Sequence, residues 1–102
     1  MTSLMTVSKA QSTLAENARA RRLAMGLTQE GLANRSGVSL PTLRKFEQKG
    51  LISLESFLKL MMVLDGLARI VEASALEQTA FSSIDDVLEA DKKPARKKGW
   101  RT

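Results

Sequence analysis

The stretch that decides the fold is TQEGLANRSGVSLPTLRKFEQKG, residues 28–50. It begins with Thr28, a residue type that often caps the first turn of a helix. The helix that follows carries Leu32 and Ala33 on its inner face. It runs out at Gly37, because glycine accepts the left-handed backbone conformation of a sharp helix exit. The first half of the stretch therefore predicts a short helix that ends in a tight turn.

A second helix follows at once, with Ser39 as its cap and Gly50 as its stop. Leu43 and Phe46 are three residues apart and lie on the buried side of this helix. The side chains predicted to point outward are cationic or carry a hydroxyl group: Thr42, Arg44 and Lys45. Two helices with so short a turn fit the helix-turn-helix arrangement, whose second helix enters the major groove of DNA.

Length and composition limit the classes of function. A chain of 102 residues predicts one domain with a small core. It contains no cysteine and no histidine, which excludes disulfides, thiolate or imidazole zinc sites and the usual general base. We therefore expect no enzyme, no metal and no cofactor. The absence of a long apolar run and of a signal-peptide pattern predicts a soluble, cytoplasmic protein without a membrane partner.

The net charge of +5 is unevenly distributed along the chain. Residues 1–50 hold eight Lys or Arg against three Glu, and residues 91–102 hold six against one Asp. Residues 51–90 reverse this balance, with two Lys or Arg against seven Asp or Glu. Such asymmetry is expected when one end of a protein faces a polyanion and another end faces a partner or a second copy.

A helix is also predicted ahead of the hairpin, after a flexible N-terminus at residues 1–6. Its apolar or small residues recur with helical spacing, and Ser8 and Gly26 are its expected cap and stop. The stripe consists of Val7, Ala10, Leu14, Ala18 and Met25. Arg22 lies on the same side, so its guanidinium should be half buried and should need a carboxylate partner.

From Arg22 to Glu47 the sequence resembles the Xre family of helix-turn-helix regulators, the phage-repressor type. The matching positions are Arg22, Gly26-Leu27-Thr28-Gln29-Glu30, Leu32-Ala33, Gly37-Val38-Ser39, Thr42-Leu43 and Phe46-Glu47. The resemblance covers roughly residues 10–65 and implies an all-α domain of five helices. It also implies that Gln29 clamps a DNA phosphate and that Arg22 and Glu47 form a buried ion pair.

The residues expected to contact bases lie in the first two turns of the second hairpin helix. They are Ser39, Leu40, Thr42, Arg44 and Lys45. Leu40 and Pro41 either touch thymine methyl groups or only shape the turn, and the sequence favours neither reading. Arg35 and Lys49 are expected to face the phosphate backbone on the flanks.

After Gly50, Ser53 caps a helix with more apolar residues than one buried face of a small domain needs. We therefore predict a two-fold dimer, with a larger monomer core as the alternative. The expected dimerisation residues are Phe57, Met61, Met62, Leu67, Ile70 and Val71. Residues 67–73 fit either a short helix or a strand that pairs with its own copy. The DNA-binding and dimerisation domain is thus placed at residues 7–73.

The C-terminal residues after position 73 are expected to bind partner proteins. Residues 74–90 are a linker and a short docking helix, which carries Ile84, Val87 and Leu88. Residues 91–102 form a basic tail that is disordered by composition. Trp100 in this tail either anchors the chain in a partner's pocket or belongs to a loose segment that gives only electrostatic attraction.

This layout is similar to that of HipB-like antitoxins, which are encoded beside HipA-type kinase toxins. The resemblance implies a homodimer that binds double-stranded operator DNA, represses its own operon and holds the kinase, with room for a third small protein in the complex. A free-standing repressor is the alternative. An interaction module that no longer reads DNA is disfavoured by Gln29, Arg44 and Lys45 together.

Overall fold

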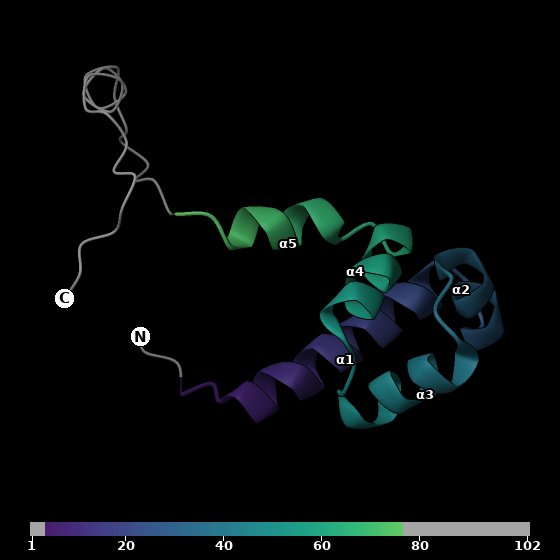
Figure 1. Cartoon of the computed structure of the whole chain (residues 1–102), viewed down its shortest axis with the longest axis horizontal. Helices are drawn as coiled ribbons and strands as arrows, with labels where there is room; N and C mark the ends of the chain where they lie inside the picture. Colours follow the sequence, from purple (N-terminus) through teal and green to yellow (C-terminus); the bar gives the residue numbers. More distant parts are fainter. Residues whose placement is uncertain (1–3, 77–102) are drawn as a thin grey trace, which may run out of the picture.

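The computed structural model describes residues 4–76, and every regular element in that range is a helix (Figure 1). The helices are α1 (Val7–Ala24), α2 (Gln29–Ser36), α3 (Leu40–Lys49), α4 (Leu54–Val63) and α5 (Leu67–Ala73). The predicted all-α fold with five helices is confirmed for these residues. Residues 67–73, for which the sequence allowed a strand, are helical.

Side-chain caps fix where the helices begin. Thr28, Ser39 and Ser53 each accept a hydrogen bond from a backbone N–H of the following first turn, as predicted. The prediction for α1 was wrong, because its cap is Thr6 and not Ser8. The Lys9 N–H donates to Thr6 Oγ1 at 3.0 Å, so α1 begins one residue after Thr6.

Two glycines in the left-handed conformation end the helices of the hairpin. Gly37 has a φ of 79° and Gly50 a φ of 75°. Gly50 has a second role, because a Cβ at this position would lie 3.0 Å from the backbone C and O atoms of Gln11. The absence of a side chain at Gly50 therefore lets the end of α3 pack directly on the backbone of α1.

The hydrophobic core lies among α1, α2, α3 and α4. The rings of Phe46 on α3 and Phe57 on α4 meet edge to face, with centroids 5.7 Å apart. The buried apolar residues around them are Ala15, Ala18, Leu32, Ala33, Val38, Leu43, Leu60, Met61 and Leu64. Leu43 and Phe46 are thus on the inner face of α3, as predicted.

The predicted apolar stripe of α1 is only partly correct. The buried positions are Ala15, Ala18 and Arg22, whereas Val7, Leu14 and Met25 are exposed. Val7 is the first residue of α1, and this end of the helix projects past the other helices (Figure 1). Helical spacing gives the period of a buried stripe but does not say how far the covering elements reach.

Two of the six predicted dimerisation residues belong to the core of the single chain. Phe57 and Met61 are buried against the other core residues, so assigning them to an exposed dimer surface was wrong. Met62 and Val71 are exposed, and Leu67 and Ile70 are partly buried. The apolar excess of α4 is therefore shared between the core and the surface.

A side chain of α1 holds the end of α4. Arg21 Nη1 donates to the carbonyl oxygen of Leu64 at 2.9 Å and to that of Asp65 at 3.2 Å. Leu64 is the C-cap residue of α4, and Asp65 has a positive φ of 64°. A cation at a helix C-terminus satisfies carbonyl groups that lack helical partners. Arg21 thus fixes the turn that leads from α4 to α5.

None of the helices within residues 4–76 is long and apolar enough to cross a membrane.

Candidate nucleic-acid interface

The outer face of α3 is a continuous polar surface. Its exposed residues recur at helical spacing along one side of the helix: Pro41, Arg44, Lys45, Gln48 and Lys49. Arg44 and Lys45 were predicted to point outward, and they do. The three cations are Arg44, Lys45 and Lys49, so a polyanion that approached this face would meet positive charge along more than one turn.

Gln48 was not among the predicted site residues, although it lies four residues after Arg44 and three after Lys45. It shares their exposed face. The sequence contained the signal, because i, i+3 and i+4 positions are neighbours on a helix surface. An amide there can donate to and accept from a base edge.

The N-terminus of α3 presents a pair of linked hydroxyl groups. Ser39 Oγ accepts from the Thr42 N–H at 3.3 Å and donates to Thr42 Oγ1 at 2.9 Å. The proton of Ser39 is used within this pair, which leaves the Thr42 hydroxyl proton available to an outside acceptor. The two predicted residues therefore act as one unit whose outward donor is Thr42.

Leu40 and Pro41 separate in the structure, although the sequence treated them together. Leu40 is partly buried and packs against the hydrophobic core. Pro41 is exposed in the first turn of α3, where its missing N–H removes no helical hydrogen bond. Packing against the core favours a turn-shaping role for Leu40, whereas Pro41 remains open to contact.

A buried ion pair fixes α3 to α1. Arg22 Nε donates to Glu47 Oε2 at 2.7 Å, and Arg22 Nη2 donates to Glu47 Oε1 at 3.0 Å. The side chains are only 8 % and 4 % exposed, respectively. The third donor used, Arg22 Nη1, reaches the carbonyl oxygen of Leu27 at 2.9 Å. The sequence predicted that the Arg22 guanidinium needs a carboxylate partner. That partner is Glu47, as the resemblance implied.

Gln29 joins the same carboxylate at the start of α2. Its Nε2 donates to Glu47 Oε1 at 3.0 Å, so this oxygen accepts from both Arg22 and Gln29. Gln29 is the first residue of α2. Its side chain therefore lies at a helix N-terminus, where the helix dipole and the free N–H groups favour an anion. Glu47 therefore joins α1, α3 and the N-terminus of α2 at one point.

The two flanking cations lie at the ends of the hairpin helices. Arg35 is exposed in the last turn of α2, and Lys49 is exposed in the last turn of α3. Lys49 shares the outer face of α3 with Lys45, since the two are four residues apart. The predicted partner-binding residues Ile84, Val87, Leu88 and Trp100 lie outside the described residues.

A comparison with protein families identifies the domain. Residues 19–67 match the helix-turn-helix family model. In this segment the chain is similar to helix-turn-helix domains. The matched segment contains the whole hairpin α2–α3 together with α4, and it begins within α1. Comparison with curated proteins and with solved structures gave no significant match.

The match supports the resemblance to Xre-type regulators. Domains of this family occur in DNA-binding transcription regulators, which are generally not enzymes. Helix α3 stands second in the α2–α3 hairpin, the position of the DNA-reading helix in this motif, and its outer face is the candidate DNA-reading surface.

Proposed function

We propose that this chain is a sequence-specific transcriptional repressor that binds operator DNA as a homodimer in the cytoplasm and catalyses no reaction. The observation that carries the proposal is the pairing of an exposed cationic face on α3 with a buried carboxylate on its inner side. Arg44 and Lys45 are exposed, while Glu47 ties the same helix to α1 and α2. A reading helix that is both cationic and rigidly held suits base recognition.

In the proposed complex, the first turns of α3 lie in the major groove. Thr42, Arg44 and Lys45 reach base edges or nearby phosphates, with Ser39 and Leu40 beside them at the helix start. Gln29 holds a phosphate at the N-terminus of α2. Arg35 and Lys49 add contacts to the phosphate backbone on the flanks.

The homodimer is proposed from the apolar side chains that stay accessible on α4 and α5. Met62 and Val71 are 62 % and 60 % exposed on consecutive helices, and an exposed apolar patch shared by neighbouring elements often marks a protein–protein interface. Leu67 and Ile70 extend this surface. A two-fold dimer would present two recognition helices to half-sites about one helical turn, ~34 Å, apart.

We propose further that the protein is the antitoxin and autoregulator of a toxin–antitoxin operon that encodes a HipA-like kinase toxin, with a third small protein as an additional member of the complex. The support is the layout of the chain, a DNA-binding domain followed by an acidic segment and a basic C-terminal end. Ile84, Val87, Leu88 and Trp100 are the proposed partner-binding residues. The alternative is a free-standing Xre-type repressor.

DNA reading is tested by selecting sequences from a random duplex pool with the purified full-length chain. The expected result is an enriched site made of two inverted half-sites. Enrichment of a single half-site would reject the dimeric mode, and no enrichment at all would reject sequence-specific reading.

The antitoxin role is tested separately, by affinity purification of the chain from its native host. Co-purification with a kinase-like protein encoded next to it is expected. Recovery of the chain alone, while it still shifts its own promoter DNA, would leave only the free-standing repressor.

A further inference from the structure

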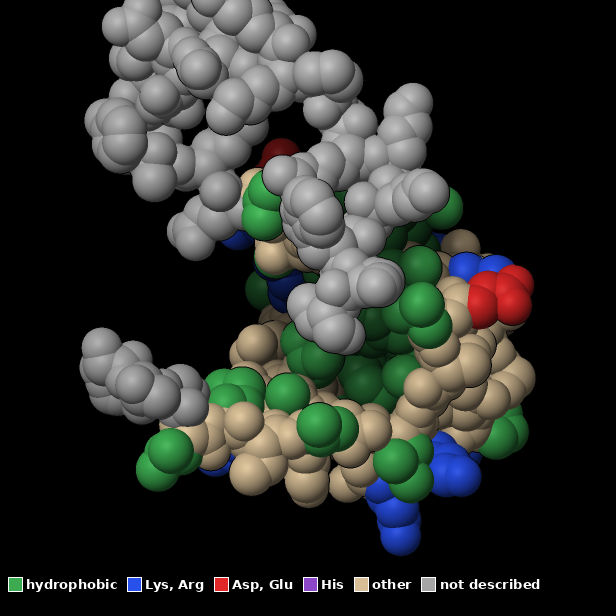
Figure 2. Space-filling view, turned by 60° about the vertical axis from the view of Figure 1, so that its left-hand side comes forward, with side chains coloured by type: hydrophobic (Ala, Val, Ile, Leu, Met, Phe, Trp, Pro, Cys, Tyr) green, Lys and Arg blue, Asp and Glu red, His purple; other side chains and the backbone are tan. Residues whose placement is uncertain are grey.

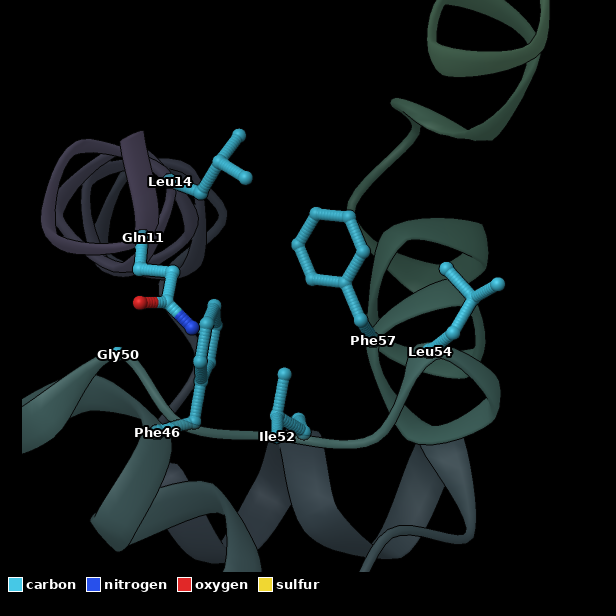
Figure 3. Close-up of a pocket in the computed structure, with 7 residues that line it drawn as sticks. All are labelled: Gln11, Leu14, Phe46, Gly50, Ile52, Leu54 and Phe57. Carbon is cyan, nitrogen blue, oxygen red and sulfur yellow. The ribbon is translucent and has the colours of Figure 1, made fainter. Parts of the chain in front are cut away.

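An apolar hollow lies on the side of the domain where α5 and the N-terminal half of α1 both project. Figure 2 looks at this side and shows hydrophobic side chains gathered in the hollow. Its lining comes from α1, the end of α3, the α3–α4 connection and α4: Gln11, Leu14, Phe46, Gly50, Ile52, Leu54 and Phe57. Leu14 and Phe57 project into the space between α1 and α4, and Ile52 projects from the segment that joins α3 to α4 (Figure 3).

The hollow suits aliphatic side chains better than a small-molecule ligand. Its volume is about 220 Å³, whereas ligand pockets usually hold ~300 to 1,000 Å³. The lining residues that the structure describes carry no charge. Leu54 and Leu14 at its edge are 70 % and 43 % exposed. Along α4 the apolar surface continues from Leu54 through Leu58 to Met62, at a spacing of four residues.

Helix α5 offers an apolar side whose chemistry matches that of the hollow. Leu67, Ile70 and Val71 fall on one side of it at helical spacing, and Arg69 and Glu72 fall on the opposite side. The helix lies wholly within the described residues and has no fully buried side chain, although Ile70 packs in part against the core of its own chain. Seven residues are too few for a helix to be stable in water without packing. Val71 and the accessible part of Leu67 on this apolar side therefore leave surface for a further contact.

One wall of the hollow and most of α5 lie outside the matched helix-turn-helix segment. The match begins at Arg19, so Gln11 and Leu14, which form one wall of the hollow, precede it. It ends at Leu67, so Ile70 and Val71 follow it. The outer wall of the hollow and the projecting helix therefore extend beyond the matched segment, and α1 and α5 project on the same side of the domain (Figure 1).

We propose that the hollow is the seat for α5 of a second copy of this chain, with each copy's α5 lying in the hollow of the other. This inference rests on the homodimer proposed above and names its contacts: Leu67, Ile70 and Val71 of one chain against Leu14, Ile52 and Leu54 of the other. Because each chain gives its α5 to the other and receives the other's α5, the assembly ends at two copies. The hollow and the apolar side of α5 are then both covered. It also places residues 7–18 of α1, which precede the matched domain, in the dimer interface.

The cysteine-free sequence allows a direct test by engineered crosslinking. Leu14→Cys and Val71→Cys are made as separate full-length variants, one with an affinity tag, and then mixed and oxidised mildly. Both positions are exposed in the single chain, so neither change opens the core. A disulfide between residues 14 and 71 of different chains is expected, since a disulfide requires Cα atoms within ~7 Å. Glu16→Cys mixed with Val71→Cys is the matched control, because Glu16 is exposed on another side of α1 and should not link.

Any of the following crosslinks would contradict the proposed exchange of α5 between two copies. A dominant 71–71 link would indicate α5 packed on α5, and an intrachain bond in the Leu14→Cys/Val71→Cys double variant would indicate an α5 that folds into its own hollow. A link from Leu14→Cys to Leu88→Cys would assign the hollow to the C-terminal segment. A monomer in sedimentation, with no links, would also reject the homodimer, while gel shifts would show independently whether the chain reads DNA.

A charge at the edge of the hollow gives a second readout. Leu14→Asp should raise the dimer dissociation constant by about tenfold or more, because a carboxylate would be buried against α5. Leu23→Asp is the matched control, since Leu23 is 52 % exposed on the same helix but does not line the hollow. Equal dissociation constants for the two variants, measured by sedimentation, would overturn the inference.

Discussion

Arg21 and Arg22 are consecutive residues of α1 that hold two different helices. Arg22 binds Glu47 of α3 through two hydrogen bonds, and Arg21 binds the carbonyl oxygens of Leu64 and Asp65 at the end of α4. One turn of α1 therefore fixes both the recognition helix and the turn into α5. In the proposed dimer, α5 sets the distance between the two recognition helices, so these arginines connect base reading with half-site spacing.

Glu47→Ala is expected to lower the free energy of unfolding by ~3 to 5 kcal/mol, because Arg22 would stay buried without its carboxylate. For a domain of this size that corresponds to a fall in Tm of more than ~10 °C. Thermal unfolding followed by circular dichroism measures the effect. Glu30→Ala is the control, since Glu30 is exposed on α2. A Tm unchanged by Glu47→Ala would contradict a stabilising role for the pair.

Arg21→Met keeps most of the aliphatic stem but removes both donors to the α4 terminus. Because Arg21 is only partly buried, we expect a loss near the lower end of the range for charged hydrogen bonds, about 1.5 kcal/mol. Amide hydrogen exchange should rise in α5 and stay slow in α3. Arg19→Met, an exposed change on the same helix, should leave both unchanged. Equal protection of α5 in the two variants would show that Arg21 does not fix the turn.

Gln29→Ala should separate the stability of the domain from its binding to DNA. Glu47 keeps both hydrogen bonds from Arg22, so only about 0.5 to 1.5 kcal/mol of stability should be lost with the Gln29 contact. Affinity for DNA should fall to a similar degree for the selected site and for unrelated duplexes, because a phosphate contact carries no sequence information. Gel shifts on both duplexes measure this. A loss confined to the selected site would instead assign Gln29 to a base.

Gly50→Ala should destabilise the domain more than Gly37→Ala. Both glycines have a positive φ, which costs an alanine about 1 to 2 kcal/mol. A Cβ at Gly50 would in addition press against the backbone of Gln11, which adds ~1 to 3 kcal/mol of overpacking, whereas nothing lies within 4 Å of a Cβ at Gly37. Chemical denaturation of the two variants gives the comparison. Similar losses in both would show that the close approach of α1 to Gly50 contributes little.

The hairpin could be predicted from the sequence because its signals are local. Thr28, Ser39, Gly37 and Gly50 occupy positions where capping and left-handed backbone dictate the residue type, and the structure has each as predicted. Arg22 and Glu47 were paired through a resemblance, since no local rule joins residues 25 positions apart. The structure supplied the further hydrogen bond from Gln29 to the same carboxylate.

The errors have a common physical cause, which is that burial depends on neighbours distant in the sequence. Val7 and Met25 fit the helical period of α1, yet no helix covers them. Phe57 and Met61 were counted as surplus apolar surface, yet both are buried in the core cluster that also contains Ala15, Ala18 and Ala33. Arg21 and Gly50 also act through contacts with segments distant in the sequence. Sequence periodicity cannot predict such contacts.

Replacing the two outward cations of α3 one at a time should show which one reads a base. Loss of a phosphate contact weakens binding to all duplexes alike and reduces the slope of log K against log salt by about one. Loss of a base contact costs ~1 to 3 kcal/mol at one position of the site and relaxes its specificity. Because arginine can bond bidentately to guanine, we expect Arg44→Ala to relax specificity and Lys45→Ala to reduce the salt slope.

The measurement is a salt series of binding constants for the selected site and for single-base variants of it. Lys59→Ala is the matched control, because it removes the same charge from α4, where Lys59 only pairs with Glu55 in an exposed i, i+4 contact. The control should change neither the salt slope nor the base preference. If Arg44→Ala and Lys45→Ala also left both unchanged, the outer face of α3 would not be the DNA-reading surface, even with the helix-turn-helix fold intact.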